Sequence, residues 1–235
     1  MTLVIAHRTG PLDGPENSPA AVARSIELGA DAIEFDVRRG RGASLLCVHD
    51  HTLTRTVGVP IPVRWTSPRL AQRLARRGRT WALDDFLAAI PHDASLAVDV
   101  KQTAAMAGTI DVLKRAGALA RSRLWVRSIT GVRIAAERAP QCERALLRNT
   151  EDVAASERYL RDAAACGATA VSLHVDAVVR GGAELIDLAH ELALTAHCWV
   201  TRADAHPAAL DAGVDSVVTD WPALARELIA KRTIS

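Results

Sequence analysis

The sequence predicts an α/β protein with a single (β/α)8 TIM barrel and an insertion after the second strand. Short apolar runs rich in β-branched residues alternate eight times with alanine-rich segments of helical spacing, over 235 residues. That alternation and length are typical of a barrel of eight parallel strands. The chain is 49% hydrophobic and 24% charged. This composition supports one buried core and excludes a disordered or fibrous protein.

The predicted elements follow one another in regular order. Gly29, Gly117, Gly167 and Gly213 stand just after predicted helices, where a left-handed cap is favoured. A doubly wound sheet is the competing fold, but the residues after the first strand lack the spacing of its glycine-rich phosphate turn. The predicted strands are residues 3–7, 32–37, 95–101, 123–129, 144–148, 169–174, 195–200 and 215–219. The predicted helices are residues 18–28, 83–90, 104–115, 132–138, 152–166, 183–192, 205–212 and 222–231.

One interval between strands is much longer than the others. Most strand starts are 20 to 28 residues apart, but 63 residues separate Ala32 from Ser95. Residues 39–80 therefore form the insertion. It contains a turn at residues 40–42, an apolar run that ends at His49, and a long loop with a short helix near residues 69–76. We expect one domain, residues 1–235, with the insertion at the end of the barrel where active sites lie.

Charge and hydropathy exclude several classes of protein. The formal net charge is +2, so no broad cationic surface for nucleic acid is expected. No run approaches the roughly 20 apolar residues that a membrane helix needs, and the amino terminus has no signal-peptide pattern. The four cysteines form no CxxC pair and are expected to be free thiols. The sequence predicts a cytoplasmic protein without stable membrane insertion and leaves the oligomeric state open.

Acidic residues interrupt two apolar strands. Glu34 and Asp36 lie two positions apart, so both side chains point to one face of a strand, and Asp99 and Lys101 repeat this spacing. Three carboxylates at one end of a barrel need a counter-charge. A hard divalent cation, Mg²⁺ or Ca²⁺, is the simplest partner, whereas zinc would prefer His and Cys ligands. The alternative is a buried salt network with arginines or with Lys101.

Two histidines stand at the carboxyl ends of apolar runs. His7 ends the first predicted strand and His49 ends the run that follows the second, so both are expected at the rim that carries the carboxylates. A histidine near its usual pKa of about 6.5 can donate or accept a proton at neutral pH, and a pair can do both in one reaction. The sequence favours structural or surface roles for the other positions considered, His51, His92, His190 and His206.

Four segments closely resemble the glycerophosphodiester phosphodiesterase family. They are IAHR at residues 5–8, GPENS at 14–18, ELGADAIEFDV at 27–37 and VHDHTLTRT at 48–56. Weaker similarity continues in LDDFL at 83–87, VDVK at 98–101 and GVDSVVTDWP at 213–222. The order and spacing of the first four segments are specific to the family, and the similarity extends along the chain.

The resemblance implies a fold, a reaction and a role for each candidate residue. The implied fold is the (β/α)8 barrel. The implied reaction is metal-dependent hydrolysis of a small glycerophosphodiester to sn-glycerol 3-phosphate and an alcohol, in lipid and glycerol metabolism. His7 and His49 would be the general acid and base. Glu34, Asp36 and Asp99 would bind the divalent metal, Mg²⁺ or Ca²⁺, Arg8 and Lys101 would contact the phosphate, and Trp199 would lie against the glycerol.

The sequence departs from the family pattern at three places. Asp99 stands where the family usually has Glu, and Thr9 stands where glycine is common. The insertion between His49 and Trp81 lacks the usual Asn-Gly turn after the Asp-x-Thr segment. Two alternatives follow: a barrel of the same ancestry that binds a phosphate ligand or acts as a scaffold without turnover, and a lysophospholipase D-type activity. The second would need an apolar rim, which Val57, Val59, Ile61, Val63 and Trp65 would supply.

Some features stay open at this stage. Arg148 and His174 each close a predicted strand, and either a pocket-lining or a packing role fits them. The alcohol of the substrate, the order of the two histidines in proton transfer, and the nucleophile are not determined. Water and the 2-hydroxyl group of the substrate are the two candidates for the nucleophile.

Overall fold

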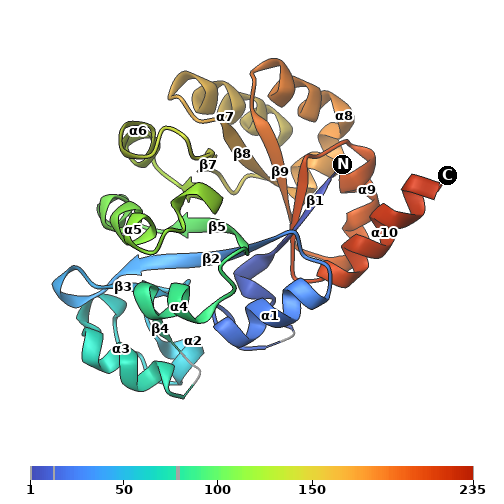
Figure 1. Ribbon diagram of the computed structural model, residues 1–235. Helices are drawn as coiled ribbons and strands as arrows, with labels where there is room; N and C mark the ends of the chain where they lie inside the picture. The colour runs from blue at the N-terminus through green and yellow to red at the C-terminus, as the bar shows by residue number, and fades with distance from the viewer. Residues whose placement is uncertain (1, 13, 78–79, 235) are drawn as a thin grey trace.

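Eight parallel strands close into a barrel in the computed structural model, which describes residues 2–12, 14–77 and 80–234. The order around the barrel is β1, β2, β5, β6, β7, β8, β9 and β10, and β10 pairs with β1. Figure 1 shows the helices arranged around the outside of these strands. The predicted barrel is confirmed. The strands are β1 (Leu3–Ala6), β2 (Ala32–Arg39), β5 (Ser95–Val100), β6 (Ser122–Val126), β7 (Arg144–Leu147), β8 (Ala170–His174), β9 (Thr195–Val200) and β10 (Ser216–Thr219).

Helices follow the strands, and side-chain caps mark where several of them begin. The side chains of Ser18, Ser128 and Asp152 accept hydrogen bonds from the backbone of the first turns of α1, α6 and α7. The four cap glycines have positive φ, as predicted. The helices around the barrel are α1 (Pro19–Glu27), α4 (Leu83–Ala89), α5 (Thr103–Arg115), α6 (Ile129–Arg138), α7 (Val153–Ala165), α8 (Val175–Glu191), α9 (His206–Asp211) and α10 (Pro222–Ile234).

Several predicted boundaries were wrong, and the end of β6 with the start of α6, and the start of α8, are the clearest cases. The strand expected at residues 123–129 ends at Val126, because Ser128 caps α6 and Ile129 is already helical. The helix expected at residues 183–192 begins at Val175, and its two parts meet at Gly182, where φ is 56° and the backbone is not helical. The earlier part is short and follows β8 directly, so helical spacing alone did not reveal it.

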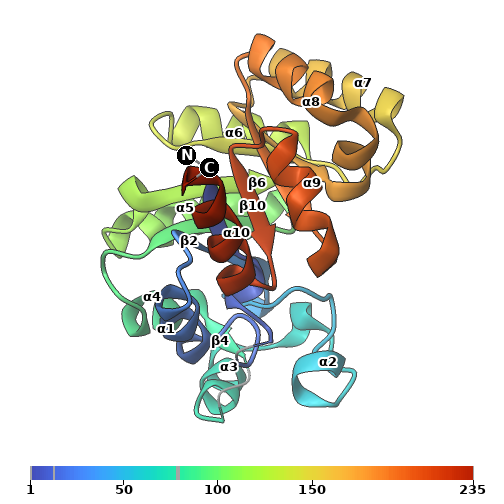
Figure 2. The same cartoon turned by 90° about the vertical axis from the view of Figure 1, so that its right-hand side faces the viewer.

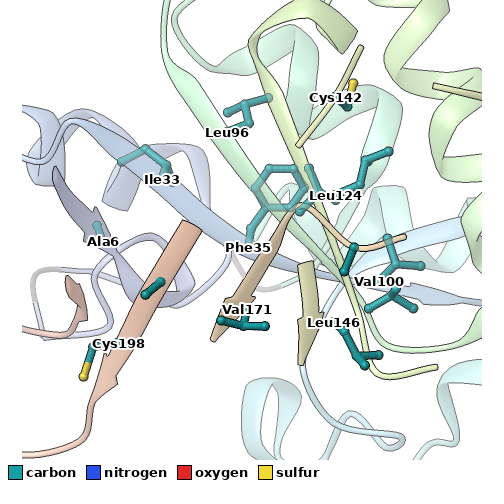
Figure 3. Close-up of a cluster of buried hydrophobic side chains, with 14 of the residues drawn as sticks. Ala6, Ile33, Phe35, Leu96, Val100, Leu124, Cys142, Leu146, Val171 and Cys198 are labelled. Carbon is teal, nitrogen blue, oxygen red and sulfur yellow. The ribbon is translucent and has the colours of Figure 1, made fainter. Parts of the chain in front are cut away.

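Apolar side chains form two cores, one on each face of the barrel wall. The outer cluster lies between the strands and the helices and contains Ile33 and Phe35 of β2, shown in Figure 3. Half of the buried members of the inner cluster are alanines, including Ala32, Ala97 and Ala170, and Trp125 is its largest member. Since side chains alternate along a strand, residues 34 and 36 share the inner face with residue 32. Polar residues therefore lie inside the barrel above the inner cluster.

The insertion is an ordered unit. β3 (Leu45–Cys47) pairs antiparallel with β2 in a hairpin, and β4 (Trp81–Ala82) pairs antiparallel with β3. The predicted turn at residues 40–42 and the predicted helix near residues 69–76, now α3 (Pro68–Ala75), are confirmed. Part of the predicted loop instead forms α2 (Thr54–Val57). Of the expected insertion, residues 39–80, positions 78–79 lie outside the described residues. Figure 2 shows α2 and α3 far from α7 and α8.

A separate small core explains why the insertion folds. Its buried members, Leu46, Val48, Leu53, Val63, Ala71 and Leu74, come from the hairpin, the loop and α3. Elsewhere in the fold, the thiols of Cys47, Cys142 and Cys198 are buried and free, and that of Cys166 is free and half-buried. Over the described parts of the chain, no helix combines the length and apolar character that crossing a membrane requires.

Candidate active site

Three carboxylates meet inside the barrel at the carboxyl ends of β2 and β5. The strand register sets Asp36 directly beside Asp99, and Glu34 lies two residues earlier on the same face of β2. The exposed fractions are 3% for Glu34, 0% for Asp36 and 5% for Asp99. One oxygen of each side chain lies within 4.8 Å of the others. The predicted convergence of these acids is confirmed.

Two cations lie against this cluster. The Nζ atom of Lys101 is 2.6 Å from Asp36 Oδ1 and also forms an ion pair with Asp99, and Arg8 Nε is 3.7 Å from Asp36 Oδ2. Burial opposes ionisation of Asp36, but the Lys101 charge overcomes it and lowers the pKa of Asp36 to about 2. Burial and the Asp36 charge raise the pKa of Glu34 to about 7. The salt network predicted as an alternative therefore exists, with Lys101 as its centre.

The cluster also has the composition of a site for a hard cation. Its donors are three carboxylates, the ligand type that Mg²⁺ and Ca²⁺ prefer. Asp99 Oδ1 is buried and has no hydrogen-bond partner among the described residues. A buried acceptor without a donor costs free energy, which a bound cation would recover. The residues present therefore fit a divalent cation, and the ion pairs of Lys101 do not use all of the carboxylate oxygens.

His7 follows β1 and is held by an acid from the last strand. Its Nδ1 atom lies 2.8 Å from Oδ1 of Asp220, which comes directly after β10. This contact leaves Nε2 as the ring nitrogen available to a ligand. Burial lowers the pKa of His7, but the hydrogen bond to Asp220 and the charge of Glu34 outweigh it, so the pKa of His7 is raised.

His49 reaches the site through the β2–β3 hairpin. The hairpin turns the chain back along β2, and the N–H of Val48 donates to the carbonyl of Asp36 at 3.1 Å. His49 Nδ1 lies 2.8 Å from Oδ1 of Asp50. Arg55 donates from Nε to the other Asp50 oxygen at 2.8 Å. Burial and the Lys101 charge lower the pKa of His49, and the Asp36 charge opposes that shift only in part.

The turn after β1 has a left-handed backbone. Arg8 and Thr9 have φ values of 47° and 65°, and the Arg8 N–H donates to Glu34 Oε2 at 2.6 Å. Left-handed conformation is unfavourable for a residue with a Cβ atom, which explains why glycine suits position 9. Thr9 is buried and compensates with two hydrogen bonds: its hydroxyl accepts from Ser18 N, and its carbonyl accepts from the Ser25 hydroxyl.

One pocket joins these groups. The indole of Trp199 on β9 lies 5.8 Å from the His7 ring and 5.5 Å from the His174 ring, measured between centroids. Asp36 is fully buried and does not itself line the pocket, although its neighbours Glu34 and Asp99 do. Arg148 and His174 belong to the lining, so their pocket-lining alternative is confirmed. The lining contains His7, Arg8, Glu34, His49, Asp99, Lys101, Trp125, Arg127, Leu147, Arg148, Asn149, Ser172, Leu173, His174, Trp199 and Val218.

A model of the glycerophosphoryl diester phosphodiesterase family matches residues 7–224, nearly the whole chain. The protein belongs to this family. A relative described as a glycerophosphodiester phosphodiesterase, from Caldanaerobacter subterraneus, is 51% identical over 55 residues, and the match covers 23% of each chain. An uncharacterized protein of Bacillus subtilis, YqiK, is 26% identical over 251 residues, covering 97% of this chain and 99% of the relative.

Solved structures of the family share the fold. A putative glycerophosphoryl diester phosphodiesterase from Agrobacterium tumefaciens superposes with a TM-score of 0.86 at 18% identity and covers 100% of both chains. A phosphodiesterase from Oleispira antarctica, in complex with the product sn-glycerol-3-phosphate, superposes with a TM-score of 0.81 at 16% identity, covering 98% of this chain and 97% of that one. At such low identity these likenesses establish the (β/α)8 barrel.

Two residues of the family segments contact the site but were not predicted as site residues. The Asn17 side chain donates from Nδ2 to Asp36 Oδ2 at 2.9 Å and accepts at Oδ1 from the Asp36 N–H at 2.9 Å. Asp220 holds His7. Both lie inside segments that resemble the family, so the motif was the available signal. Arg127, Asn149 and Ser172 line the pocket with no motif to mark them.

Proposed function

We propose that this protein hydrolyses glycerophosphodiesters to sn-glycerol 3-phosphate and an alcohol, with a divalent cation bound by Glu34, Asp36 and Asp99. The observation that carries the proposal is the meeting, in one pocket, of a buried carboxylate cluster and two histidines that are each held by an acid. Membership of the family supports it. The product bound to the Oleispira antarctica phosphodiesterase fits a small-molecule substrate of the same kind.

The residues match what the reaction requires. A phosphodiester is a monoanion, so a catalyst must neutralise its oxygens, activate a nucleophile and protonate the leaving alkoxide. When bound, the cation would supply positive charge next to the phosphate and act as a Lewis acid. Arg8 and Lys101 add two further positive charges at the same end of the barrel.

His7 and His49 carry the proton transfers in this proposal. In each ring the Nδ1 atom contacts a carboxylate oxygen, so the Nε2 atom is left for the substrate. One histidine takes a proton from the nucleophile, and the other gives a proton to the leaving alkoxide. Trp199 packs beside His7 and offers an apolar wall to the glycerol moiety.

The decisive experiment is an assay of the purified protein with glycerophosphocholine and Mg²⁺ or Ca²⁺, in which sn-glycerol 3-phosphate is measured by coupled oxidation. Release of sn-glycerol 3-phosphate is the expected result. Binding of the diester without release would favour the non-catalytic barrel. A panel of diesters with titration of each metal would then identify the alcohol and the preferred cation.

The lysophospholipase D-type alternative has less support. Val63 is buried in the core of the insertion, and Val57 and Ile61 pack against that core, while Val59 and Trp65 are exposed. Among the described residues that line the pocket, none comes from the segment 57–65. Val57, Ile61 and Val63 therefore pack in the insertion, and the exposed Val59 and Trp65 do not line the pocket.

Asp220→Asn is expected to lower kcat for glycerophosphodiester hydrolysis by about 10- to 100-fold, with a smaller change in KM. The amide oxygen can still accept a hydrogen bond from the Nδ1–H group of His7, but the negative charge that raises the pKa of His7 is lost. The pKa of His7, measured by NMR titration of its ring, should fall in the variant.

The matched control for this variant is Asp215→Asn. Asp215 pairs with His190 at 2.9 Å on the exposed side of the protein, so the control removes the same kind of charge from the same kind of pair. The control should keep wild-type kcat. An Asp220→Asn enzyme with wild-type kcat and an unshifted His7 pKa would contradict the positioning role.

Asn17→Ala is expected to weaken divalent metal binding by about 10- to 100-fold, the usual effect of removing a group that orients a metal ligand. The Asn17 side chain makes two hydrogen bonds to Asp36, one with its carboxylate and one with its backbone. Isothermal titration with Mg²⁺ and with Ca²⁺ measures the change. Unchanged affinity for both metals in a variant that folds normally would show that Asp36 needs no such support.

The domain organisation and cellular location predicted from the sequence remain part of this proposal. Residues 1–235 are proposed to act as one domain, because the insertion supplies His49 to a pocket built by the barrel. The cytoplasmic location stays a prediction. Localisation of a tagged full-length chain by fractionation would test it.

A further inference from the structure

The charges that line the pocket are distributed unevenly. The carboxylates of the lining, Glu34 and Asp99, belong to β2 and β5. Arg8 and Lys101 lie on the same side and are engaged with carboxylates: Lys101 pairs with Asp36 and Asp99, and Arg8 lies near Asp36 and Glu16. On this side of the pocket the positive and negative charges largely offset one another.

Two further guanidinium groups follow β6 and β7, the next strands around the barrel after β5, and have no such partners among the described residues. Arg127 comes directly after β6 and Arg148 directly after β7, and both side chains line the pocket and are exposed. Within residues 2–12, 14–77 and 80–234, neither group forms an ion pair. No carboxylate among the described lining residues comes from β6, β7 or β8.

The two arginines lie near each other, and Arg127 continues the strand register beside Lys101, while Arg148 lies one strand further around the barrel. Val126 of β6 pairs with Leu146 of β7, so the two residues leave adjacent strands at the same end. The strand order sets β7 across the barrel from β1, with three strands between them on each side. Burial raises the pKa of the Tyr159 hydroxyl, and the charges of Arg148 and Arg127 both oppose that rise, consistent with their proximity.

We propose that Arg127 and Arg148 bind a compact anionic substituent, a carboxylate or a phosphate monoester, on the alcohol half of the diester. The inference rests on the proposed function. In the proposed function the scissile phosphate lies between His7, His49 and the cation that the carboxylate cluster would hold, and the glycerol moiety is neutral, so a second negative charge would belong to the alcohol. Paired guanidinium groups are well suited to carboxylate and phosphate oxygens. The Asn149 amide lines the same side and offers a further donor.

Pairs of substrates that differ only in the anionic group test the proposal. Glycerophosphoserine differs from glycerophosphoethanolamine by one carboxylate, and glycerophosphoinositol 4-phosphate differs from glycerophosphoinositol by one phosphate. We expect kcat/KM to be at least ten-fold higher for the anionic member of one pair. Whichever pair shows the preference identifies carboxylate or phosphate as the substituent.

The double variant Arg127→Gln/Arg148→Gln should lose this preference. Its kcat/KM should fall at least ten-fold for the anionic diester and less than three-fold for the matched diester. The control is Arg133→Gln/Arg158→Gln, which removes two exposed arginines from α6 and α7, the helices that follow the same strands. The control should keep the wild-type preference.

Equilibrium binding separates this inference from the proposed function. Titration calorimetry of the same diesters with the His49→Ala variant measures recognition without turnover. Equal affinity for the two diesters of each pair would overturn the anion site without affecting the proposed hydrolysis. So would an equal loss of kcat/KM for both members of a pair in the double arginine variant. An anion preference in binding, with no hydrolysis of any diester by the wild-type protein, would support the site and refute the proposed function.

Discussion

Replacing His49 by alanine is expected to lower kcat for glycerophosphocholine hydrolysis by about 10²- to 10⁴-fold, the usual contribution of one general acid or base. His7→Ala should have an effect of the same size. The two rings line one pocket, and each is oriented through Nδ1 by its own carboxylate, Asp50 or Asp220. Without either ring, one of the two proton transfers has no group to perform it.

The control for these variants is His51→Ala. His51 is exposed and lies two residues from His49 on the same loop, so the control removes an imidazole without removing the proposed chemistry. Thermal unfolding should be nearly unchanged in all three variants, because none of the side chains belongs to a hydrophobic core. Hydrolysis by His49→Ala at close to the wild-type rate would refute the assignment.

The histidine variants leave the nucleophile undetermined, and a separate time course addresses it. In ¹⁸O-labelled water, attack by water gives linear phosphate from the first time point. Attack by the 2-hydroxyl of the glycerol moiety gives a cyclic phosphate that precedes the linear product. Quenched samples analysed by mass spectrometry distinguish the two routes.

Removing divalent cations with a chelator is expected to lower the rate of glycerophosphodiester hydrolysis by at least about 100-fold, and Mg²⁺ or Ca²⁺ should restore it. Glu34→Gln should weaken metal binding and activity together. The glutamine keeps an acceptor for the Arg8 N–H, and Glu34 is not an ion-pair partner of Lys101, so the fold should persist. Full activity in the presence of excess chelator would refute the metal proposal.

A partly exposed acid outside the pocket provides the control for Glu34→Gln. Glu143 accepts from Trp125 and pairs with His197 at 2.8 Å, and Glu143→Gln should keep the wild-type metal affinity.

The pH dependence of metal affinity adds a second readout. Because the pKa of Glu34 is about 7, a cation must displace its proton at lower pH. Apparent metal affinity should therefore weaken as the pH falls below about 7, and Glu34→Gln should reduce this dependence.

The strands and the inward position of the acids could be predicted from local patterns. Side chains of a strand alternate between its two faces, so the sequence around residues 33–36 already separates Glu34 and Asp36 from Ile33 and Phe35. The structure confirms this separation: Ile33 and Phe35 pack in the outer cluster, and the acids lie inside the barrel. Boundaries such as that of α8 were less predictable, because a short helical segment before Gly182 has little periodicity.

The contacts that orient the site residues could not be predicted from local patterns. Asp220 meets His7 across 213 positions of the chain, and Asn17 meets Asp36 across 19. The His7–Asp220 contact depends on closure of the barrel, which brings β10 beside β1, and the Asn17–Asp36 contact depends on the pairing of β1 with β2. The sequence placed Arg148 at the end of a strand but did not bring it together with Arg127, because their proximity comes from the pairing of β6 with β7.

The amino-acid sequence by itself determined the order of strands and helices, the family, and the residues able to carry acid–base and metal chemistry, because these depend on periodicity and on motifs of a few residues. Only the tertiary structure decided which charges are compensated. It paired Lys101 with Asp36 and Asp99, gave each histidine its own carboxylate, and left Arg127 and Arg148 unpaired among the described residues. Electrostatic interactions depend on distance and burial in three dimensions, which separation along the chain does not specify.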